Sequence, residues 1–359
     1  VLDTDNTSYA FAVLGSGQLE HLYYGRKLHA NEAVMTEKHT FIPGNTNVYN
    51  KDYSSYSLED VCLEMSSLGK GDIREPFIEV TYPNGSSTTD MVFDRAEIIQ
   101  GKEEYDTLPG SYDDNGEVEQ LVIYLKDRNY NLTLELHYYV YEKCDIITRS
   151  AKLVNSGNES VRLERLMSMQ LDLNESDYEL SFFNGAWARE MNRSRIPIRA
   201  GKYVNESVTG TSSNRANPFF MIGRSSTTED YGECYGFNLI YSGNHYEAAQ
   251  VNSYGKLRLV SGINPATFSY IIEAGKCFEA PEAVLTYSYK GYNKMSHNMH
   301  EFVRKHIVRG SWRDKERPVL INSWEAAYFN INERKLVKLA KAAKDTGVEL
   351  FVMDDGWFG

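Results

Sequence analysis

The stretch LFVMDDGWFG (residues 350–359) sets two adjacent carboxylates, Asp354 and Asp355, directly after four apolar residues. The apolar run contains no polar residue and is too short for a helix. It therefore predicts a strand buried on both faces, as in parallel sheets covered by helices. Because burying an unpaired carboxylate costs several kcal/mol, we expect Asp354 and Asp355 at the carboxyl end of this strand. That end of the strands is where α/β sheets and barrels bind ligands.

The residues before this stretch predict a second strand and a helix. Residues 319–321 follow a proline and indicate a short buried strand. A helix comes next, which Asn330 or Asn332 can cap and which Gly347 ends. Its apolar face is expected at Leu336, Leu339, Ala340 and Ala343. A strand, a helix and a strand within about forty residues form a βα unit that feeds a parallel sheet.

Residues 1–289 carry β patterns instead. The segment LTLELHYYVY (132–141) begins with strict alternation, which sets Leu132, Leu134 and Leu136 on one face of a sheet. Turn motifs recur, among them YPNGSS (82–87) and DDNGE (113–117), whose Asn-Gly pairs favour hairpins. This region predicts one large antiparallel β-sandwich, or supersandwich, without a helix.

Residues 290–315 predict a linker helix with Gly310 as its stop, because apolar residues recur there at helical spacing. His297 and His300 lie on this helix, but no Cys or Glu cluster accompanies them. A solvated helix face is therefore favoured over a metal site.

These patterns divide the chain into a sandwich domain (1–289), the linker helix (290–315) and a βαβ segment (316–359). A (β/α)₈ TIM barrel needs about 250 residues, so the last segment holds only the first strand, first helix and second strand of one. The predicted fold class is β plus α/β, and we expect the sequence to be the front portion of a longer protein.

Composition excludes several classes of function. The net charge of −12 and the pI near 5.3 argue against nucleic acid or an anionic membrane as a partner. No stretch approaches the roughly 20 apolar residues of a membrane span. The four scattered cysteines predict buried free thiols and a cytoplasmic location. The 26 tyrosines suit half-buried strands first, and oligomer interfaces or sugar stacking second.

Several motifs together resemble one family. LINSWEAAYFNINERKLVKLAKAAKDTGVELFVMDDGWFG (320–359) resembles the start of the catalytic barrel in glycoside hydrolase family 36 α-galactosidases. LEHLYYGRKL, GKGDIREPFIEV, FFNGAWARE, SSNRANPFF and YGFNLIYSGN resemble blocks of that family's N-terminal β domain, in the same order.

The resemblance implies a retaining exo-glycosidase that removes terminal α-linked galactose from oligosaccharides such as melibiose and raffinose, without a cofactor or a metal. Both catalytic aspartates of the family are expected beyond Gly359. Asp354 and Asp355 match the family's sugar-binding pair, and Trp324 matches a tryptophan that lines its pocket. Trp187 matches a β-domain tryptophan that reaches a neighbouring subunit's pocket in the family's homotetramer.

Each of these residues has a structural alternative. Asp354 and Asp355 can be solvated or capping carboxylates, and either tryptophan can be a packing residue. Asp72 and Arg74 in GDIR fit the family pattern and equally fit a structural ion pair. Asp52 is a weaker candidate for a contact across an interface.

Two further functions stay open at this point. One is an α-N-acetylgalactosaminidase or galactosyl transferase of the same family. The other is a non-catalytic sugar-binding or assembly module made of the sandwich alone.

Overall fold

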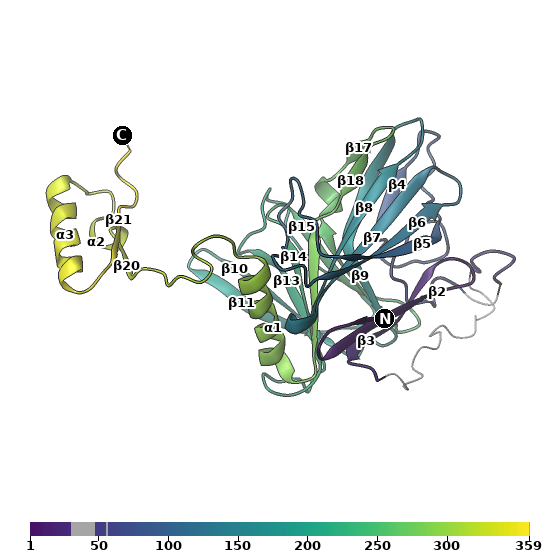
Figure 1. The fold of residues 1–359 in the computed structure, drawn as a ribbon, viewed down its shortest axis with the longest axis horizontal. Coiled ribbons are helices and arrows are strands. Elements are labelled where there is room, and N and C mark those ends of the chain that lie inside the picture. Colours follow the sequence, from purple (N-terminus) through teal and green to yellow (C-terminus); the bar gives the residue numbers. More distant parts are fainter. Residues whose placement is uncertain (30–46, 55–56, 359) are drawn as a thin grey trace. The chain divides into compact units, whose positions relative to one another are not determined.

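The structure is a computed structural model of the 359-residue chain and describes residues 1–29, 47–54 and 57–358. The chain divides into two compact units, Val1–Ile307 and Val308–Gly359. The first unit consists mainly of β-strands, and the second contains two short strands and two helices (Figure 1).

Within the described residues, the first unit contains three sheets, and all pairings between their named strands are antiparallel, as predicted. The smallest sheet has the strands β1 (Leu2–Asp3), β2 (Thr7–Val13) and β3 (Leu19–Arg26). Six strands form the second sheet: β4 (Ile78–Thr81), β9 (Val161–Leu173), β12 (Gly201–Glu206), β15 (His245–Val251), β16 (Leu257–Ile263) and β17 (Tyr270–Ile272).

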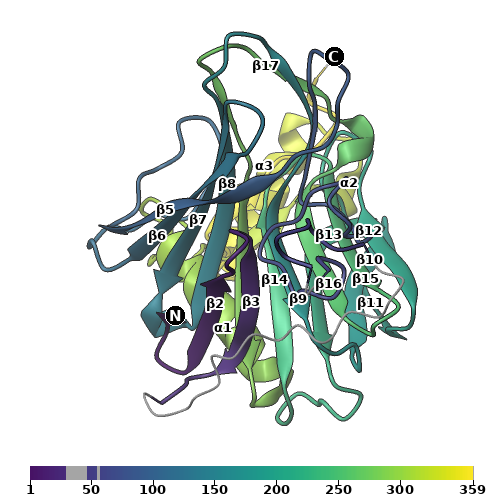
Figure 2. The ribbon, with the colours of Figure 1, turned by 90° about the vertical axis from the view of Figure 1, so that its right-hand side faces the viewer.

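The largest sheet runs in the order β11-β10-β13-β14-β19-β8-β7-β6-β5, with β18 paired to β8 (Figure 2). Its members are β5 (Met91–Gln100), β6 (Glu119–Asp127), β7 (Leu132–Tyr141), β8 (Ile146–Asn155), β10 (Glu179–Ala186), β11 (Arg189–Pro197), β13 (Ala216–Gly223), β14 (Cys234–Ile240), β18 (Cys277–Glu279) and β19 (Glu282–Ser288). Two 3-10 turns, η1 (Glu142–Cys144) and η2 (Pro265–Thr267), are the helical elements described before Gly291.

The core of the first unit joins the large sheet to the six-stranded sheet. The alternation in β7 is as predicted, with Leu132, Leu134 and Leu136 buried. These side chains share one apolar cluster with residues of β9 and β16, such as Leu171 and Leu259. Burial of this shared cluster holds the two sheets together as a sandwich.

The placement of tyrosines and cysteines bears on two expectations. Many tyrosines of the sandwich are buried, among them Tyr9, Tyr24 and Tyr138. The hydroxyls of Tyr9 and Tyr138 both donate to the buried carboxylate of Glu64, so these tyrosines reflect strand packing, the first of the predicted causes. All four cysteines are free, yet Cys277 is exposed because it begins the short strand β18, which pairs with β8 alone in the described sheet.

The predicted linker helix is α1 (Gly291–His306), which ends four residues before Gly310. It belongs to the first compact unit (Figure 1). Its side chains Tyr292, Met295 and Phe302 are buried in apolar clusters with residues of the large sheet. His297 and His300 are exposed, which agrees with a solvated helix face.

The second unit is a βα unit with one additional short helix. Its elements are β20 (Leu320–Asn322), α2 (Trp324–Ala327), α3 (Glu333–Asp345) and β21 (Leu350–Val352). β20 and β21 are parallel, as predicted. Asn332 caps α3 by accepting a hydrogen bond from the backbone N–H of Lys335 at 3.0 Å. Only the predicted apolar positions of α3 are withdrawn from solvent within the helix: Leu336, Leu339, Ala340 and Ala343.

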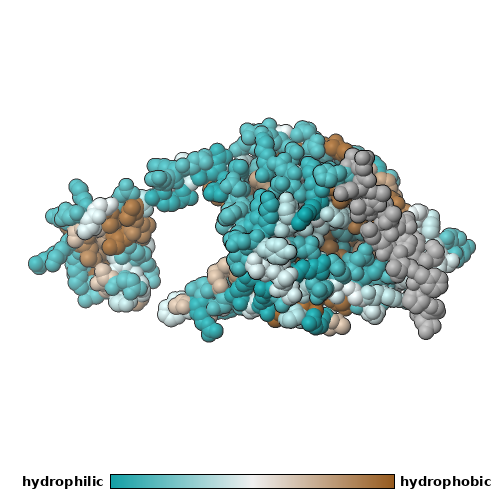
Figure 3. All heavy atoms as spheres, turned by 90° about the horizontal axis from the view of Figure 1, so that it is seen from below, coloured by the Kyte–Doolittle hydropathy of each residue, from teal (hydrophilic) through white to brown (hydrophobic). Residues whose placement is uncertain are grey.

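The prediction that both strands are buried is wrong for this unit. Val319, Leu320 and Leu350 are 59%, 51% and 40% exposed. In the described part of this unit the sheet has two strands, and α2 and α3 are the helices that accompany it. Figure 3 shows the resulting apolar surface, in brown, on the second unit.

Candidate functional site

The carboxyl ends of β20 and β21 bring together five residues that we call the strand-end site. Three follow or end β20, and two follow β21: Asn322, Ser323, Trp324, Asp354 and Asp355. The strands are parallel with Asn322 opposite Val352, so both carboxyl ends lie at the same edge of the sheet. The predicted placement of both aspartates directly after the strand is confirmed.

Asp354 is held from several sides. Asn322 donates a hydrogen bond from Nδ2 to Oδ2 of Asp354 at 2.8 Å. The N–H of Asp355 donates to Oδ1 of Asp354, also at 2.8 Å. The N–H of Asp354 itself donates to the hydroxyl of Ser323 at 3.1 Å, and Ser323 is only 1% exposed. The carboxylate of Asp354 is therefore fixed in position and half-buried.

Asp355 differs from its neighbour. It is exposed, and its carboxylate makes no hydrogen bond or ion pair with any residue that the structure describes. An exposed carboxylate with free acceptor sites beside a fixed one can receive two hydroxyl groups of one ligand. The sequence offered no reason to distinguish the two aspartates. In the structure, the Asp354 carboxylate is held by hydrogen bonds, whereas the Asp355 carboxylate is exposed and accepts none from the described residues.

Trp324 lies at the start of α2, two residues after the end of β20. Its ring is half-buried and makes edge contacts with Tyr328 and Phe329, at centroid distances of 5.3 and 4.9 Å. Its backbone N–H donates to Oδ1 of Asn322 at 2.7 Å. Trp324 and Asp354 are thus tied to the same asparagine.

Trp187 lies in the first unit, in the two-residue turn that joins β10 to β11. Ala186 pairs with Arg189 across this turn, and Ala188 adopts a positive φ of 56° there. The indole is 92% exposed, so packing within the described sandwich does not explain it. An exposed tryptophan on a well-paired hairpin suits contact with another molecule.

Asp72 and Arg74 belong to a structure-supporting group that we call the buried ion cluster: Asp72, Arg74, Asp172 and Arg258. Arg258 contacts Asp72 at 2.7 Å and Asp172 at 2.6 Å, and Arg74 contacts the same two carboxylates at 2.9 and 3.1 Å. All four side chains are buried. The structural alternative for Asp72 and Arg74 therefore agrees with their surroundings.

Asp52, the weakest candidate, is exposed near Asn50, whose side chain accepts a hydrogen bond from the Asp52 N–H at 2.9 Å. Asn322 and Ser323 were missed at the sequence level. Their position directly after the strand in LINSW, parallel to Asp354 after its own strand, was the available signal.

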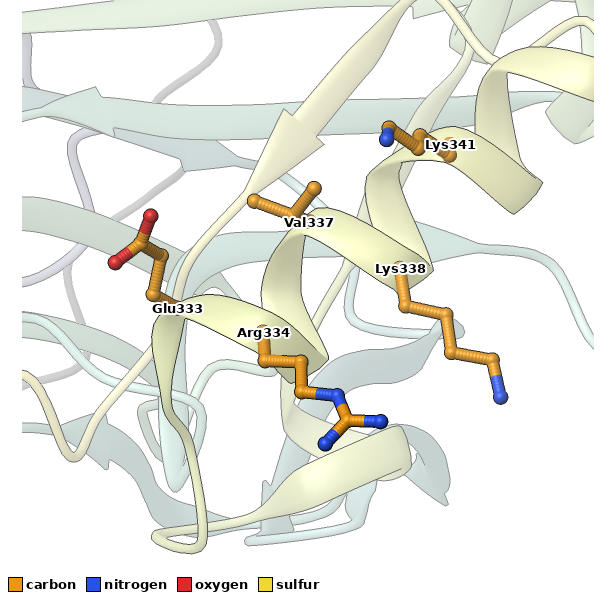
Figure 4. A pocket seen from close by; sticks show the side chains of 5 residues that line it. All are labelled: Glu333, Arg334, Val337, Lys338 and Lys341. Atoms are coloured by element: carbon orange, nitrogen blue, oxygen red, sulfur yellow. The ribbon is translucent and has the colours of Figure 1, made fainter.

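Two cavities in the structure are lined by residues outside the strand-end site. One of about 600 Å³ lies along α3 and is lined by Glu333, Arg334, Val337, Lys338 and Lys341. Figure 4 shows these side chains spread along one helix, and none belongs to the strand-end site.

A hollow of about 430 Å³ lies in the first unit beside Tyr178, Glu175 and Glu233. Arg224 pairs with both glutamates, at 2.7 Å for Glu233, so both carboxylates already have a cationic partner within the sandwich.

In the part of the chain that the structure describes, no group of three or more His, Cys, Asp or Glu side chains could hold a metal ion. None of its helices is both long and apolar enough to cross a membrane.

Comparison with known proteins covers the whole chain. Residues 17–273 match the Glycosyl hydrolase family 36 N-terminal domain, and residues 277–359 match the Melibiase family. Alpha-galactosidase AgaA of Geobacillus stearothermophilus is 39% identical over 100% of this chain and 49% of its own length. The chain spans about half the length of the curated relatives that it matches.

Two solved structures have nearly the same fold. The alpha-galactosidase from Lactobacillus brevis superposes with a TM-score of 0.96 at 39% identity, covering 100% of this chain and 48% of that one. A variant of AgaA in complex with raffinose gives a TM-score of 0.96 at 37% identity, covering 100% of this chain and 50% of that one.

Proposed function

The chain belongs to glycosyl hydrolase family 36, and from this premise we propose that the whole protein removes terminal α-linked galactose from oligosaccharides such as melibiose and raffinose. The proposed enzyme is a retaining exo-glycosidase, in which one carboxylate attacks the anomeric carbon and another acts first as acid and then as base. Both of these carboxylates are proposed to lie outside the 359 residues. Within them, Asp354, Asp355 and Trp324 are proposed to bind the terminal galactose.

One observation carries this proposal: the strand-end site lies in the segment that matches the Melibiase family and presents a fixed carboxylate beside an open one. Galactose is a neutral ligand with several neighbouring hydroxyl groups. Hydrogen bonds from hydroxyls to ionised carboxylates are about twice as strong as neutral ones, so two adjacent aspartates suit such a ligand. Trp324 adds an aromatic surface next to them, and aromatic rings can stack on the C–H faces of sugars.

Adjacent Asp354 and Asp355 do not suit the two catalytic roles. In a retaining enzyme the catalytic carboxyl groups lie about 5–5.5 Å apart on opposite sides of the bond that breaks. Here the N–H of Asp355 is bound to the carboxylate of Asp354, and that carboxylate is also held by Asn322. Both oxygens of the Asp354 carboxylate therefore already accept hydrogen bonds, which suits an acceptor for ligand hydroxyls better than a nucleophile.

The experiment that tests the function follows hydrolysis of melibiose and raffinose by the whole protein with proton NMR. Release of α-galactose before its β-anomer is the expected result, because a retaining mechanism conserves the anomeric configuration. Release of β-galactose first would contradict retention, and no release from either sugar would contradict the function itself. Parallel assays with an α-N-acetylgalactosaminide and with sugar acceptors separate the two related activities.

We also propose that the protein is a homo-oligomer, a tetramer by family resemblance, in which Trp187 reaches the sugar site of a neighbouring subunit. Its 92% exposure on a well-paired hairpin supports this role. The proposed location is cytoplasmic, which the four free cysteines suit.

A further inference from the structure

The side chain of Asn322 connects two residues of the proposed sugar site. Its Nδ2 donates to Oδ2 of Asp354 at 2.8 Å, and its Oδ1 accepts from the backbone N–H of Trp324 at 2.7 Å. Both ends of the amide are therefore used, one on each strand-end segment. Within the described part of the chain, Asn322 is the one side chain that donates to the carboxylate of Asp354.

The residue type matters at this position. The Trp324 N–H needs an acceptor, and the Asp354 carboxylate needs a donor, so the amide of Asn322 can satisfy both in one orientation only. Reversing the amide would set its oxygen against the carboxylate and its NH₂ against an N–H. An aspartate here could still accept from Trp324 but could not donate to Asp354 while both carboxyl groups are ionised.

Ser323 provides a second support for Asp354, at its backbone. Its hydroxyl accepts from the N–H of Asp354 at 3.1 Å, while its own N–H donates to the carbonyl of Val352 at 3.0 Å. The backbone of Asp354 is thus fixed by Ser323, and its carboxylate is fixed by Asn322. These two supports act on different parts of Asp354. Loss of Asn322 therefore leaves the backbone in place, and the carboxylate keeps only the hydrogen bond from the Asp355 N–H.

We propose that Asn322 is a positioning residue, which fixes the Asp354 carboxylate and the Trp324 backbone with one amide so that both are ready to receive galactose. This inference rests on the proposed function and assigns Asn322 no contact with the sugar. A carboxylate that is already oriented loses less conformational freedom on binding, so the ligand is bound more tightly.

The main test is Asn322→Asp in the whole protein, with galactose binding measured by calorimetry at several pH values. The new carboxylate lies within about 3 Å of Asp354, and repulsion between the two charges raises the pKa at which the pair takes up a proton, so both groups are ionised only at the upper end of the pH range. At about pH 7.5 we expect galactose affinity to fall about tenfold to a hundredfold. As the pH is lowered toward 5, the pair takes up a proton that restores a donor, so the ratio of the variant's dissociation constant to that of wild type should shrink.

A second variant and a matched control keep the test decisive. Asn322→Ala cannot donate at any pH, so its loss of affinity should be similar throughout the range. Asn332→Ala removes an asparagine from the same unit that only caps α3. It should lower the melting temperature and leave the galactose dissociation constant unchanged. kcat/KM for an α-galactoside should follow the dissociation constants.

The outcomes separate this inference from the proposed function. If wild type binds galactose and both Asn322 variants bind it within twofold of wild type, Asn322 does not position the site. The same conclusion follows if Asn322→Ala, like Asn332→Ala, lowers only the melting temperature. If Asn322→Asp does not fold, the affinity of Asn322→Ala decides. Failure of wild type itself to bind galactose would overturn the proposed function, and this inference with it.

Discussion

Two pairs of aspartates in this chain are set in opposite surroundings. Asp72 and Asp172 lie in the buried ion cluster, where two arginines neutralise both carboxylates. Asp354 and Asp355 follow β21 and have no arginine partner among the residues that the structure describes, and Asp355 is exposed. A buried carboxylate must be paired, because its desolvation is otherwise uncompensated. An accessible carboxylate with free acceptor sites can bind a ligand, and this difference separates the buried ion cluster from the proposed binding pair.

The largest expected effect is on the stability of the first pair. Asp172→Ala leaves Asp72 as the one carboxylate of the cluster for two buried arginines, and breaking buried ion pairs in this way costs about 3–5 kcal/mol. Denaturant unfolding of the whole protein, followed by circular dichroism, measures the change. Asp355→Ala is the matched substitution at the exposed pair and should stay within about 0.5 kcal/mol of wild type. If both substitutions lowered the free energy of unfolding equally, the proposed difference between the buried and the exposed aspartates would be contradicted.

The next largest expected effect is on ligand binding, and it concerns the accessible pair, Asp354 and Asp355, in place of the buried one. Asp355→Ala and Asp354→Ala in the whole protein should each weaken galactose binding by about 1.5–3 kcal/mol, because each loses a hydrogen bond to a charged group. The inhibition constant for galactose measures this loss. Unchanged inhibition constants in both variants would refute the sugar-binding assignment. Lys276→Gln, a conservative substitution at an exposed position of the first unit, serves as the control for general damage.

A somewhat smaller effect is expected at Trp187, which extends the comparison to the sandwich. Trp187→Ala should lower sugar affinity by about 1–3 kcal/mol if its indole reaches a neighbouring subunit. Because the ring is 92% exposed, the melting temperature should barely change, whereas a core tryptophan would cost about 3–5 kcal/mol.

Subunit mixing provides the control for Trp187. Trp187→Ala protein is combined with protein that carries a defective Asp354–Asp355 pair, and the subunits are allowed to exchange. If the pocket is shared, some mixed oligomers contain complete sites after exchange, and part of the activity returns. Hybrids that stay inactive after proven exchange would show that Trp187 does not act across subunits.

The smallest expected effect is the acid dependence of the buried ion cluster. Burial alone would raise the pKa of Asp72, but the guanidinium groups of Arg258 and Arg74 outweigh it and hold this pKa below its usual value. The folded pKa thus lies below the unfolded one, near 3.9, so the stabilisation is complete above about pH 4 and is lost as the pH falls through the folded value. The free energy of unfolding should decline with acid less steeply in Asp72→Asn than in wild type. Parallel declines would contradict the assignment.

The sequence predicted those features that depend on local patterns. The alternation of Leu132, Leu134 and Leu136 predicted one buried face, and Asn332 was one of two predicted helix caps. Both follow from periodicity and side-chain chemistry within a few residues. The strand-end position of Asp354 was predicted for the same reason, since charge terminates an apolar strand.

The features that the sequence did not reveal depend on contacts between distant segments. Arg258 is 186 residues from Asp72, and no local pattern pairs them. Asn322 was missed because its role appears only when β20 lies beside β21 and its amide meets Asp354. The exposure of Leu320 and Leu350 was also mispredicted, because burial depends on which other elements cover a sheet.

A crystal structure of the whole protein with galactose tests the central claim most directly. The account predicts galactose hydroxyls within about 2.5–3.0 Å of carboxylate oxygens of both Asp354 and Asp355, with Asn322 still bound to Asp354. Galactose bound elsewhere, or bound with both carboxylates out of hydrogen-bonding distance, would contradict it.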